Sequence, residues 1–305
     1  MNSSAAPRKS TPAEWNVRGR NAIVTGGTAG IGLETAYGLA ERGANVVITG
    51  RQAERGHAAC AKIVARLQGQ PGAGTVRWMP LDLGDFQSIL GFAKAVRQTF
   101  RHLHILVHNA GMVVATREET VDGFEAMWGV NHMGPFTLNR LLLEWLKASA
   151  PARIVVVASD AHRLCRGFDF DDLQMKARFR SWPAYARSKL ANILFARALS
   201  TRLEGTGVTV NALHPGVIAS EFGREGGRWI RWFFRFGRPF LKSTTQGAAT
   251  TLFVACDPHI AGVSGAYFAN QRLAKPSKVA RDYDLAEALW EVSNALAAGS
   301  SLAAF

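Results

Sequence analysis

A tyrosine and a lysine are spaced one helical turn apart in SWPAYARSKLANILFARALS, residues 181–200. This segment is predicted to be helical, because Ala and Leu dominate it and apolar residues recur every three or four positions. Tyr185 and Lys189 then share one face of the helix. Such pairs are also common on solvated helices, so the rest of the chain has to decide what this pair does.

A phenol beside an ammonium is suited to moving a proton at an alcohol or carbonyl oxygen. With an unperturbed pKa of about 10, a phenol is a poor base at neutral pH. A fixed ammonium one turn away stabilises the phenolate and brings the pKa toward the working range. The pair therefore suggests the proton transfer that accompanies movement of a hydride to or from a carbonyl carbon.

The elements that would position this pair are short apolar runs alternating with amphipathic, helix-length segments. Several runs are rich in Val and Ile without polar alternation, as expected of strands covered on both faces. We expect strands at 21–26, 45–50, 75–81, 103–108, 153–159, 207–214 and 264–269, and helices near 31–42, 52–68, 85–100, 122–148, 182–204 and 281–297. This alternation predicts an α/β fold with a doubly wound parallel sheet, the Rossmann fold.

The 305 residues suit one large domain or two small ones, and neither an internal repeat nor a clear second domain is visible. We expect a single domain over 20–298. A flexible polar leader over 1–19 and a tail over 299–305 would flank it. The leader lacks the apolar segment of a secretory signal, while its Ser and Arg content leaves organelle targeting open.

A glycine-rich turn, TGGTAGIGLETA at 25–36, directly follows the first predicted strand and opens the first predicted helix. Gly26, Gly30 and Gly32 permit a tight turn and a close approach of the backbone to a pyrophosphate, which the helix N-terminus would bind. Glycines also simply end strands, but the strand–turn–helix context favours a dinucleotide site.

An arginine follows the second predicted strand, where dinucleotide folds face the adenosine ribose. An acid there would accept a hydrogen bond from the 2′-hydroxyl group. This chain has Arg51, with Arg55 one turn later, and guanidinium groups suit a 2′-phosphate. The alternative is two solvated arginines at a helix start. The position favours NADP(H) over NAD(H).

Composition limits the class of protein. An apolar content of 48% excludes a disordered chain, and no apolar run is long enough to span a membrane. Three scattered cysteines fit a reducing compartment, and the histidines do not cluster as metal ligands. We expect a cytoplasmic protein without a metal site. The net charge of +13 favours a nucleotide, a nucleic acid or a membrane surface as partner.

Several motifs occur in the order typical of one family, over roughly residues 20–296. They are TGGTAGIG (25–32), LDL (81–83), NAG (109–111), VNHMGPF (130–136), RIVVVASDAH (153–162), YARSK (185–189) and HPGVIAS (214–220). On these motifs the chain resembles the short-chain dehydrogenases/reductases, and DGFEAMWGVNHMGPF and SKLANILFARAL resemble the retinol dehydrogenase branch.

The resemblance implies catalytic roles for four residues. Tyr185 would be the general acid/base, and Lys189 would hold the nicotinamide ribose and lower the tyrosine pKa. Ser159 would bind the substrate oxygen, and Asn131 would support a proton path through water. Ser159 also ends a predicted strand, where ligands of open α/β sheets bind.

The resemblance also implies the course of the cofactor. It would lie along Gly26, Thr28, Gly30, Ile31, Gly32, Arg51, Asp82, Leu83, Asn109, Ala110, Gly111, Tyr185, Lys189, Pro215, Gly216 and Ile218. Asp82 is equally placed to cap the helix that begins near 85, so both readings stay open.

The resemblance implies that the domain over 20–298 is a dehydrogenase domain with a substrate lid at about 217–245. A basic, aromatic segment, RWIRWFFRFGRPFLK at 228–242, falls within this lid. Its cations recur every three or four residues, as in a helix lying at a membrane surface. Peripheral membrane contact, a lid packed on its own domain and a subunit contact remain alternatives. Each of the first two implies an apolar substrate.

Three functions compete. The first is NADP(H)-dependent hydride transfer to or from a lipophilic alcohol, aldehyde or ketone of retinoid, prenol or steroid type, with carbonyl reduction expected in cells. The second is an NADP(H)-binding scaffold or redox sensor. The third is nucleic-acid binding, which no recognised module supports. The intact Ser159, Tyr185, Lys189 and Asn131 favour hydride transfer, and a homodimer stays open.

Overall fold

The computed structural model describes residues 15–216 and 243–299. Its strands are β1 (Asn21–Val24), β2 (Asn45–Gly50), β3 (Val76–Pro80), β4 (Ile105–His108), β5 (Ala152–Val157), β6 (Val208–His214), β7 (Tyr267–Ala269) and β8 (Arg272–Leu273). Its α-helices are α1 (Gly30–Glu41), α2 (Ala53–Leu67), α3 (Phe86–Thr99), α4 (Ala126–Trp128), α5 (Gly134–Ala148), α6 (Ser181–Arg202), α8 (Thr244–Cys256) and α9 (Tyr283–Ala298).

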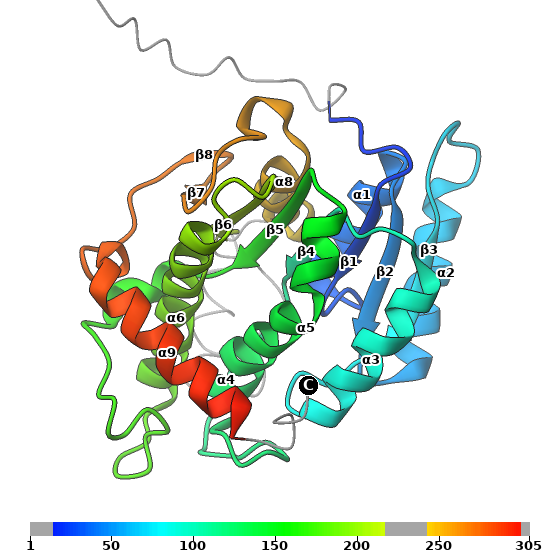
Figure 1. Cartoon of the computed structure of the whole chain (residues 1–305). Helices are drawn as coiled ribbons and strands as arrows, with labels where there is room; N and C mark the ends of the chain where they lie inside the picture. Colours follow the sequence, from blue (N-terminus) through cyan, green and yellow to red (C-terminus); the bar gives the residue numbers. More distant parts are fainter. Residues whose placement is uncertain (1–14, 217–242, 300–305) are drawn as a thin grey trace, which may run out of the picture.

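The strands form one sheet in the order β3-β2-β1-β4-β5-β6-β7-β8, with helices on both sides (Figure 1). Neighbouring strands from β3 to β7 are parallel, and β8 runs antiparallel to β7. The strand order reverses between β1 and β4, which is where open α/β sheets bind ligands. The predicted doubly wound parallel sheet is therefore confirmed.

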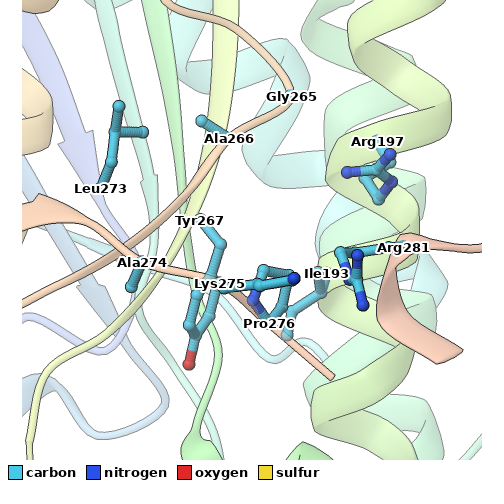
Figure 2. Close-up of a pocket in the computed structure, with 10 residues that line it drawn as sticks. All are labelled: Ile193, Arg197, Gly265, Ala266, Tyr267, Leu273, Ala274, Lys275, Pro276 and Arg281. Carbon is cyan, nitrogen blue, oxygen red and sulfur yellow. The ribbon is translucent and has the colours of Figure 1, made fainter. Parts of the chain in front are cut away.

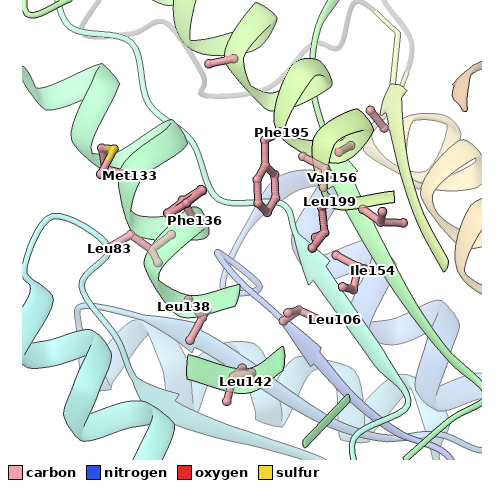
Figure 3. Packing of buried hydrophobic residues seen from close by; sticks show 14 of the residues in the cluster. Leu83, Leu106, Met133, Phe136, Leu138, Leu142, Ile154, Val156, Phe195 and Leu199 are labelled. Carbon is pink, nitrogen blue, oxygen red and sulfur yellow. The ribbon is translucent and has the colours of Figure 1, made fainter. Parts of the chain in front are cut away.

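Alternate residues of the central strands are buried in two separate apolar cores. Ile154 and Val156 of β5 pack with residues of α3, α5, α6 and α9, whereas Val155 and Val157 pack with residues of α1, α2 and α8. Figure 3 shows the first of these cores, with Ile154, Val156 and Phe195 among its labelled side chains. Burial on both faces explains the unbroken Val/Ile run of this strand.

Aromatic rings join α5, α6 and α9. The ring of Phe136 lies 5.0 Å from that of Trp290, and the Phe195 ring stacks on Trp290 at 6.1 Å with an interplanar angle of 5°. Arg202 of α6 adds a two-fold hydrogen-bonded ion pair with Glu287 of α9, at 2.8 and 2.7 Å. The C-terminal helix is thus fixed to the helix that carries Tyr185.

The structure adds α8, which the sequence analysis did not expect. Its sequence, TTQGAATTLFVAC, has no clear apolar period and carries residues of low helix propensity. A local signal was present, because Ser243 and Gln246 form a capping box. Residues 243–245, assigned to the end of the lid, therefore begin this helix. The remainder of the lid, 217–242, lies outside the described residues, as does its basic, aromatic part.

The aromatic contact between the helices makes Phe136 a test of the packing. Phe136 is 1% exposed, so Phe136→Ala is expected to lower the free energy of unfolding by about 3–5 kcal/mol through lost burial and a residual cavity. Urea unfolding followed by circular dichroism measures this change. The control is Val64→Ala, at a side chain that is 55% exposed, with an expected change within about 0.5 kcal/mol. Equal losses in both variants would contradict the assigned core.

Candidate active site

A cavity of about 1440 Å³ lies at the carboxyl ends of the parallel strands. It collects side chains and backbone from the loops after β1, β2, β3, β4, β5 and β6 and from the start of α6. The residues named by the sequence analysis that line it are Gly26, Thr28, Gly30, Ile31, Gly32, Arg51, Asp82, Leu83, Asn109, Ala110, Gly111, Ser159, Tyr185, Lys189, Pro215 and Gly216. Ile218 lies outside the described residues.

The glycine-rich turn closes tightly against the end of β4. Gly26 has a φ of +65°, and a Cβ there would lie 2.9 Å from the Cα of Ala110. A Cβ on Gly32 would lie 2.3 Å from the carbonyl oxygen of Gly26. Larger residues are therefore excluded at both positions, and the backbone itself forms the cavity wall.

The start of α1 faces this cavity through Gly30, Ile31 and Gly32. Its N-cap residue, Ala29, provides no side-chain hydrogen bond to the first-turn amides. Unpaired amides and the positive end of the helix dipole suit a phosphate group. The turn therefore fits the pyrophosphate of a dinucleotide.

Hydrogen bonds hold the ends of β1 and β4 together beside the turn. The hydroxyl oxygen of Thr25 accepts from the backbone N–H groups of Asn109 and Ala110, at 3.0 and 3.1 Å. The Asn109 side-chain amide donates to the carbonyl of Thr25 at 2.9 Å. These bonds fix the NAG segment against the glycine-rich turn.

Three cations line the part of the cavity at the end of β2. Arg51 is exposed there, with Arg55 and Lys62 on the adjoining helix α2. The sequence analysis did not single out Lys62. Its signal was helical spacing, because Arg55 and Lys62 are two turns apart and therefore share a face of α2.

Asp82 does not cap α3. Its carboxylate accepts from the N–H of Gly84 at 2.9 Å and borders the cavity. Asp85 is the cap, because its carboxylate accepts from the N–H groups of Gln87 and Ser88. The alternative reading of Asp82 as a helix cap is therefore wrong, and Asp82 stays in the cavity wall.

Tyr185, Lys189 and Ser159 meet where β5 ends beside α6. Tyr185 and Lys189 are 7% and 3% exposed, and the Lys189 Nζ atom lies 5.6 Å from the centre of the Tyr185 ring. The ammonium donates to the carbonyl of Val157 at 3.2 Å. Ser159 accepts a hydrogen bond from the N–H of Ala161 at 3.2 Å, which fixes it after the strand.

Burial dominates the titration of these groups. It raises the pKa of Tyr185 to about 12, while a hydrogen bond with Ser159 lowers it. Burial also lowers the pKa of Lys189 to about 8. The direction for Tyr185 is opposite to the one expected from its pairing with Lys189. Loss of water around the phenol outweighs a lysine whose ammonium is turned toward Val157.

Asn131 is fully buried behind the cavity wall instead of lining it. It lies in a π-helical turn, Gly129–Met133, between α4 and α5. Its side chain accepts from the N–H of Met112 at 2.7 Å and donates to the Met112 carbonyl at 3.0 Å and to the Ser188 hydroxyl at 3.0 Å. Asn131 thus ties the segment after β4 to α6.

Gly111 leaves the space between these groups open. A Cβ on this glycine would lie 3.2 Å from the Lys189 Nζ atom and 3.3 Å from the Asn131 Oδ1 atom. Asn131 and Lys189 therefore both approach the same point beside Gly111.

A polar cluster that the sequence analysis did not assign borders the Ser159 segment. The Asp160 carboxylate lies 3.6 Å from the His214 Nε2 atom and 3.3 Å from the Arg163 Nε atom. It also accepts from the Tyr267 hydroxyl at 3.1 Å. Asp160, Arg163 and His214 line the cavity. The one feature of the sequence that could have pointed to these residues is that they lie close to Ser159 or within the HPG motif.

Apolar side chains complete the wall near Tyr185. Leu164 and Trp182 line the cavity although they are 71% and 46% exposed, and Met112 and Val113 lie beside them. The Trp182 ring meets the Tyr185 ring edge-on at 5.9 Å. Large apolar side chains around a cavity suit an apolar ligand.

Two kinds of feature are absent from the described residues, 15–216 and 243–299. No helix in these ranges is long and apolar enough to cross a membrane. The same ranges contain no group of three or more His, Cys, Asp or Glu side chains placed to hold a metal ion.

The chain is similar to known oxidoreductases along most of its length. A family model described as short chain dehydrogenase matches residues 20–230. Retinol dehydrogenase 11 of Homo sapiens is 44% identical over 278 residues, covering 90% of this chain and 85% of that protein. Dehydrogenase/reductase SDR family member 13 of Bos taurus is 45% identical over 286 residues, covering 92% of this chain and 74% of that protein.

Solved structures share the architecture. An uncharacterised protein from Mycobacterium paratuberculosis has a TM-score of 0.75 and 31% identity, covering 94% of this chain and 97% of that one. The RhlG/NADP active-site complex of Pseudomonas aeruginosa has a TM-score of 0.67 and 27% identity, covering 85% of this chain and 97% of that one. From its sequence relatives and from the site described above, the chain belongs to the short-chain dehydrogenase/reductase family of oxidoreductases.

Proposed function

We propose that the protein transfers a hydride between NADP(H) and a lipophilic alcohol, aldehyde or ketone of retinoid, prenol or steroid type, with carbonyl reduction as the direction in cells. The observation that carries this proposal is the meeting of Tyr185, Lys189 and Ser159 at one end of the cavity that the glycine-rich turn opens. The family uses a nicotinamide dinucleotide, and the residues present fit one.

The binding roles follow from the cavity wall. The amides at the start of α1 would hold the pyrophosphate, and Gly26 and Gly32 provide the close approach. Arg51, Arg55 and Lys62 would pair with the 2′-phosphate that distinguishes NADP(H) from NAD(H). Relatives named as retinol dehydrogenases and the exposed Leu164 and Trp182 support an apolar substrate.

The proton chemistry falls to the buried pair. A bound cofactor supplies or accepts the hydride. Tyr185, a phenol that is protonated at neutral pH and whose pKa burial raises further, to about 12, donates to the carbonyl oxygen in the reductive direction. Ser159 donates a hydrogen bond to the same oxygen as negative charge develops on it. Lys189 holds the ribose and stabilises the phenolate left by proton transfer, and Asn131 keeps the segment after β4 in place.

The remaining features of the chain belong to the same proposal. We infer one domain over 20–298, a cytoplasmic location, and a lid over 217–242 that contacts the apolar substrate or a membrane surface. A homodimer stays open. The competing candidate, a cofactor-binding scaffold with little turnover, predicts tight NADPH binding without carbonyl reduction.

Removing the phenol hydroxyl tests the acid–base assignment. Tyr185→Phe is expected to lower kcat for retinal reduction by about 10²–10⁴-fold, because the proton donor is lost while the ring stays packed. The Kd of NADPH, followed by its fluorescence, should change by less than about threefold. Tyr283→Phe, at a ring that is 60% exposed, is the matched control and should keep wild-type turnover. Near-normal kcat in Tyr185→Phe would refute the assignment.

Removing a guanidinium tests the cofactor preference. Arg51→Ala is expected to weaken NADPH by about tenfold or more and to leave NADH within about twofold, because a charge-assisted contact to the 2′-phosphate is lost. Calorimetric titration gives both Kd values. Arg77→Ala removes an exposed arginine of β3 that does not line the cavity, and it should affect neither. An equal loss of affinity for NADPH and NADH would contradict the proposed contact between Arg51 and the 2′-phosphate.

The buried ammonium is expected to cost stability. Because burial lowers the pKa of Lys189 from 10.5 to about 8, the unfolded chain binds more protons between these values, and stability rises with pH there. Lys189→Met is expected to raise the free energy of unfolding at pH 7 by about 1–3 kcal/mol, because it removes the buried charge. The gain should shrink as the pH rises from 8 toward 10, as chemical denaturation can measure. A loss of stability at pH 7 would show that Lys189 is held for packing.

A further inference from the structure

A second cavity, which we call the edge pocket, lies between α6, the end of the sheet at β7 and β8, and the 3₁₀ helix Val279–Arg281. It has a volume of about 350 Å³ (Figure 2). No described residue lines both the edge pocket and the active-site cavity. The edge pocket is therefore separate from the proposed site of hydride transfer.

The charge of the edge pocket is of one sign. Arg197, Lys275 and Arg281 line it, and no described carboxylate does. Within the described chain none of the three forms an ion pair, whereas Arg202, five residues after Arg197 on α6, pairs with Glu287. The acid next to Arg281, Asp282, accepts from the N–H of Leu285 and caps α9. The pocket thus presents unneutralised cations to a ligand.

Arg197 is held in position before any ligand binds. Its guanidinium carbon lies 4.3 Å from the centre of the Tyr283 ring, a stacked arrangement that restricts the side chain. Its Nε atom is buried and has no hydrogen-bond partner among the described residues. A buried N–H without a partner is unfavourable, so this guanidinium retains hydrogen-bonding capacity that the described residues do not use.

The loop that carries Lys275 is also fixed. The backbone carbonyl of Lys275 accepts from the Arg163 Nη2 atom at 2.9 Å. The N–H of Ser277 donates to the His162 Nε2 atom at 3.1 Å. The N–H of Ala274 donates to the carbonyl of Tyr267 at 2.9 Å. A wall fixed on both sides of Lys275 loses little entropy on binding, which favours a discrete site.

The rest of the wall is apolar. Ile193 and Tyr267 are buried beside the cations, and Pro276 lies between Lys275 and the buried Ile193 in the view of Figure 2. Leu273 stands at the rim with 59% of its surface exposed. Apolar surface next to these three cations fits a ligand with a negatively charged head and a hydrocarbon part.

We propose that the edge pocket binds an amphiphilic phosphate, with the phosphate group between Arg197, Lys275 and Arg281 and its hydrocarbon against Ile193, Leu273 and Pro276. A phosphate monoester carries two negative charges and therefore matches several cations better than a single carboxylate does. A guanidinium group can also donate two parallel hydrogen bonds to the oxygens of one phosphate. The ligand is either a soluble alkyl phosphate or the headgroup of a phospholipid, which share this chemistry.

Calorimetry with hexyl phosphate tests the site on the full chain. The double variant Lys275→Gln/Arg281→Gln removes two exposed cations from the pocket and is expected to bind at least about tenfold more weakly than wild type. The matched control Arg272→Gln/Lys278→Gln removes two exposed cations that neighbour the pocket without lining it. It should bind within about twofold of wild type. Equal thermal midpoints of the variants confirm that both are folded.

Co-sedimentation with phosphatidylcholine vesicles containing phosphatidic acid separates the two sources of ligand. A loss of vesicle binding confined to the pocket variant identifies the lipid headgroup, and unchanged vesicle binding identifies a soluble phosphate, provided hexyl phosphate binding is lost in either case. The proposal is overturned if hexyl phosphate does not bind, or if it binds the pocket variant as tightly as wild type. It is also overturned if the pocket variant and the control variant lose affinity for hexyl phosphate equally.

Discussion

The hydrogen bonds from the backbone N–H groups of Asn109 and Ala110 to the Thr25 hydroxyl hold the site together. They join the ends of β1 and β4 where the strand order reverses, so that the glycine-rich turn and the NAG segment form one wall. With this wall fixed, the close contact between Gly26 and Ala110 leaves room for backbone only. The start of α1 would then hold the phosphates of a dinucleotide that lies across the strand ends.

The end of the cavity beside α6 combines two groups that burial destabilises in their charged forms. Burial raises the pKa of Tyr185 and lowers that of Lys189, so each charge would be more favourable in water. A protein retains such groups where their chemistry is needed, which is why perturbed pKa values mark candidate sites. Tyr185 is protonated at neutral pH, as a phenol with a pKa of about 10 or above must be, so it can serve as the proton donor in the reductive direction. The helix that carries both residues is fixed from outside by the Phe195 and Trp290 rings.

Much of the fold and the outline of the site follow from the sequence, because both rest on local patterns. The Val/Ile run of β5 predicts a doubly covered strand, and the spacing of Gly26, Gly30 and Gly32 predicts the turn. The expectations that failed depend on the surroundings that the fold creates or on a competing residue nearby. The pKa of Tyr185 is set by what buries it, and Asp82 lost the capping role to Asp85, three residues away. Helix α8 lacks an apolar period because it packs through small residues. Its Ser243 capping box was the one local signal that indicated a helix.

The most direct test of the central claim follows the hydride itself. NADPH carrying deuterium at the transferable position of the nicotinamide ring is incubated with the protein and retinal, and the product alcohol is analysed by mass spectrometry. The account predicts that deuterium appears on the carbinol carbon when one of the two faces of the ring is labelled and not when the other is. An alcohol product free of deuterium with both labelled cofactors, or no alcohol product despite tight NADPH binding, would contradict it.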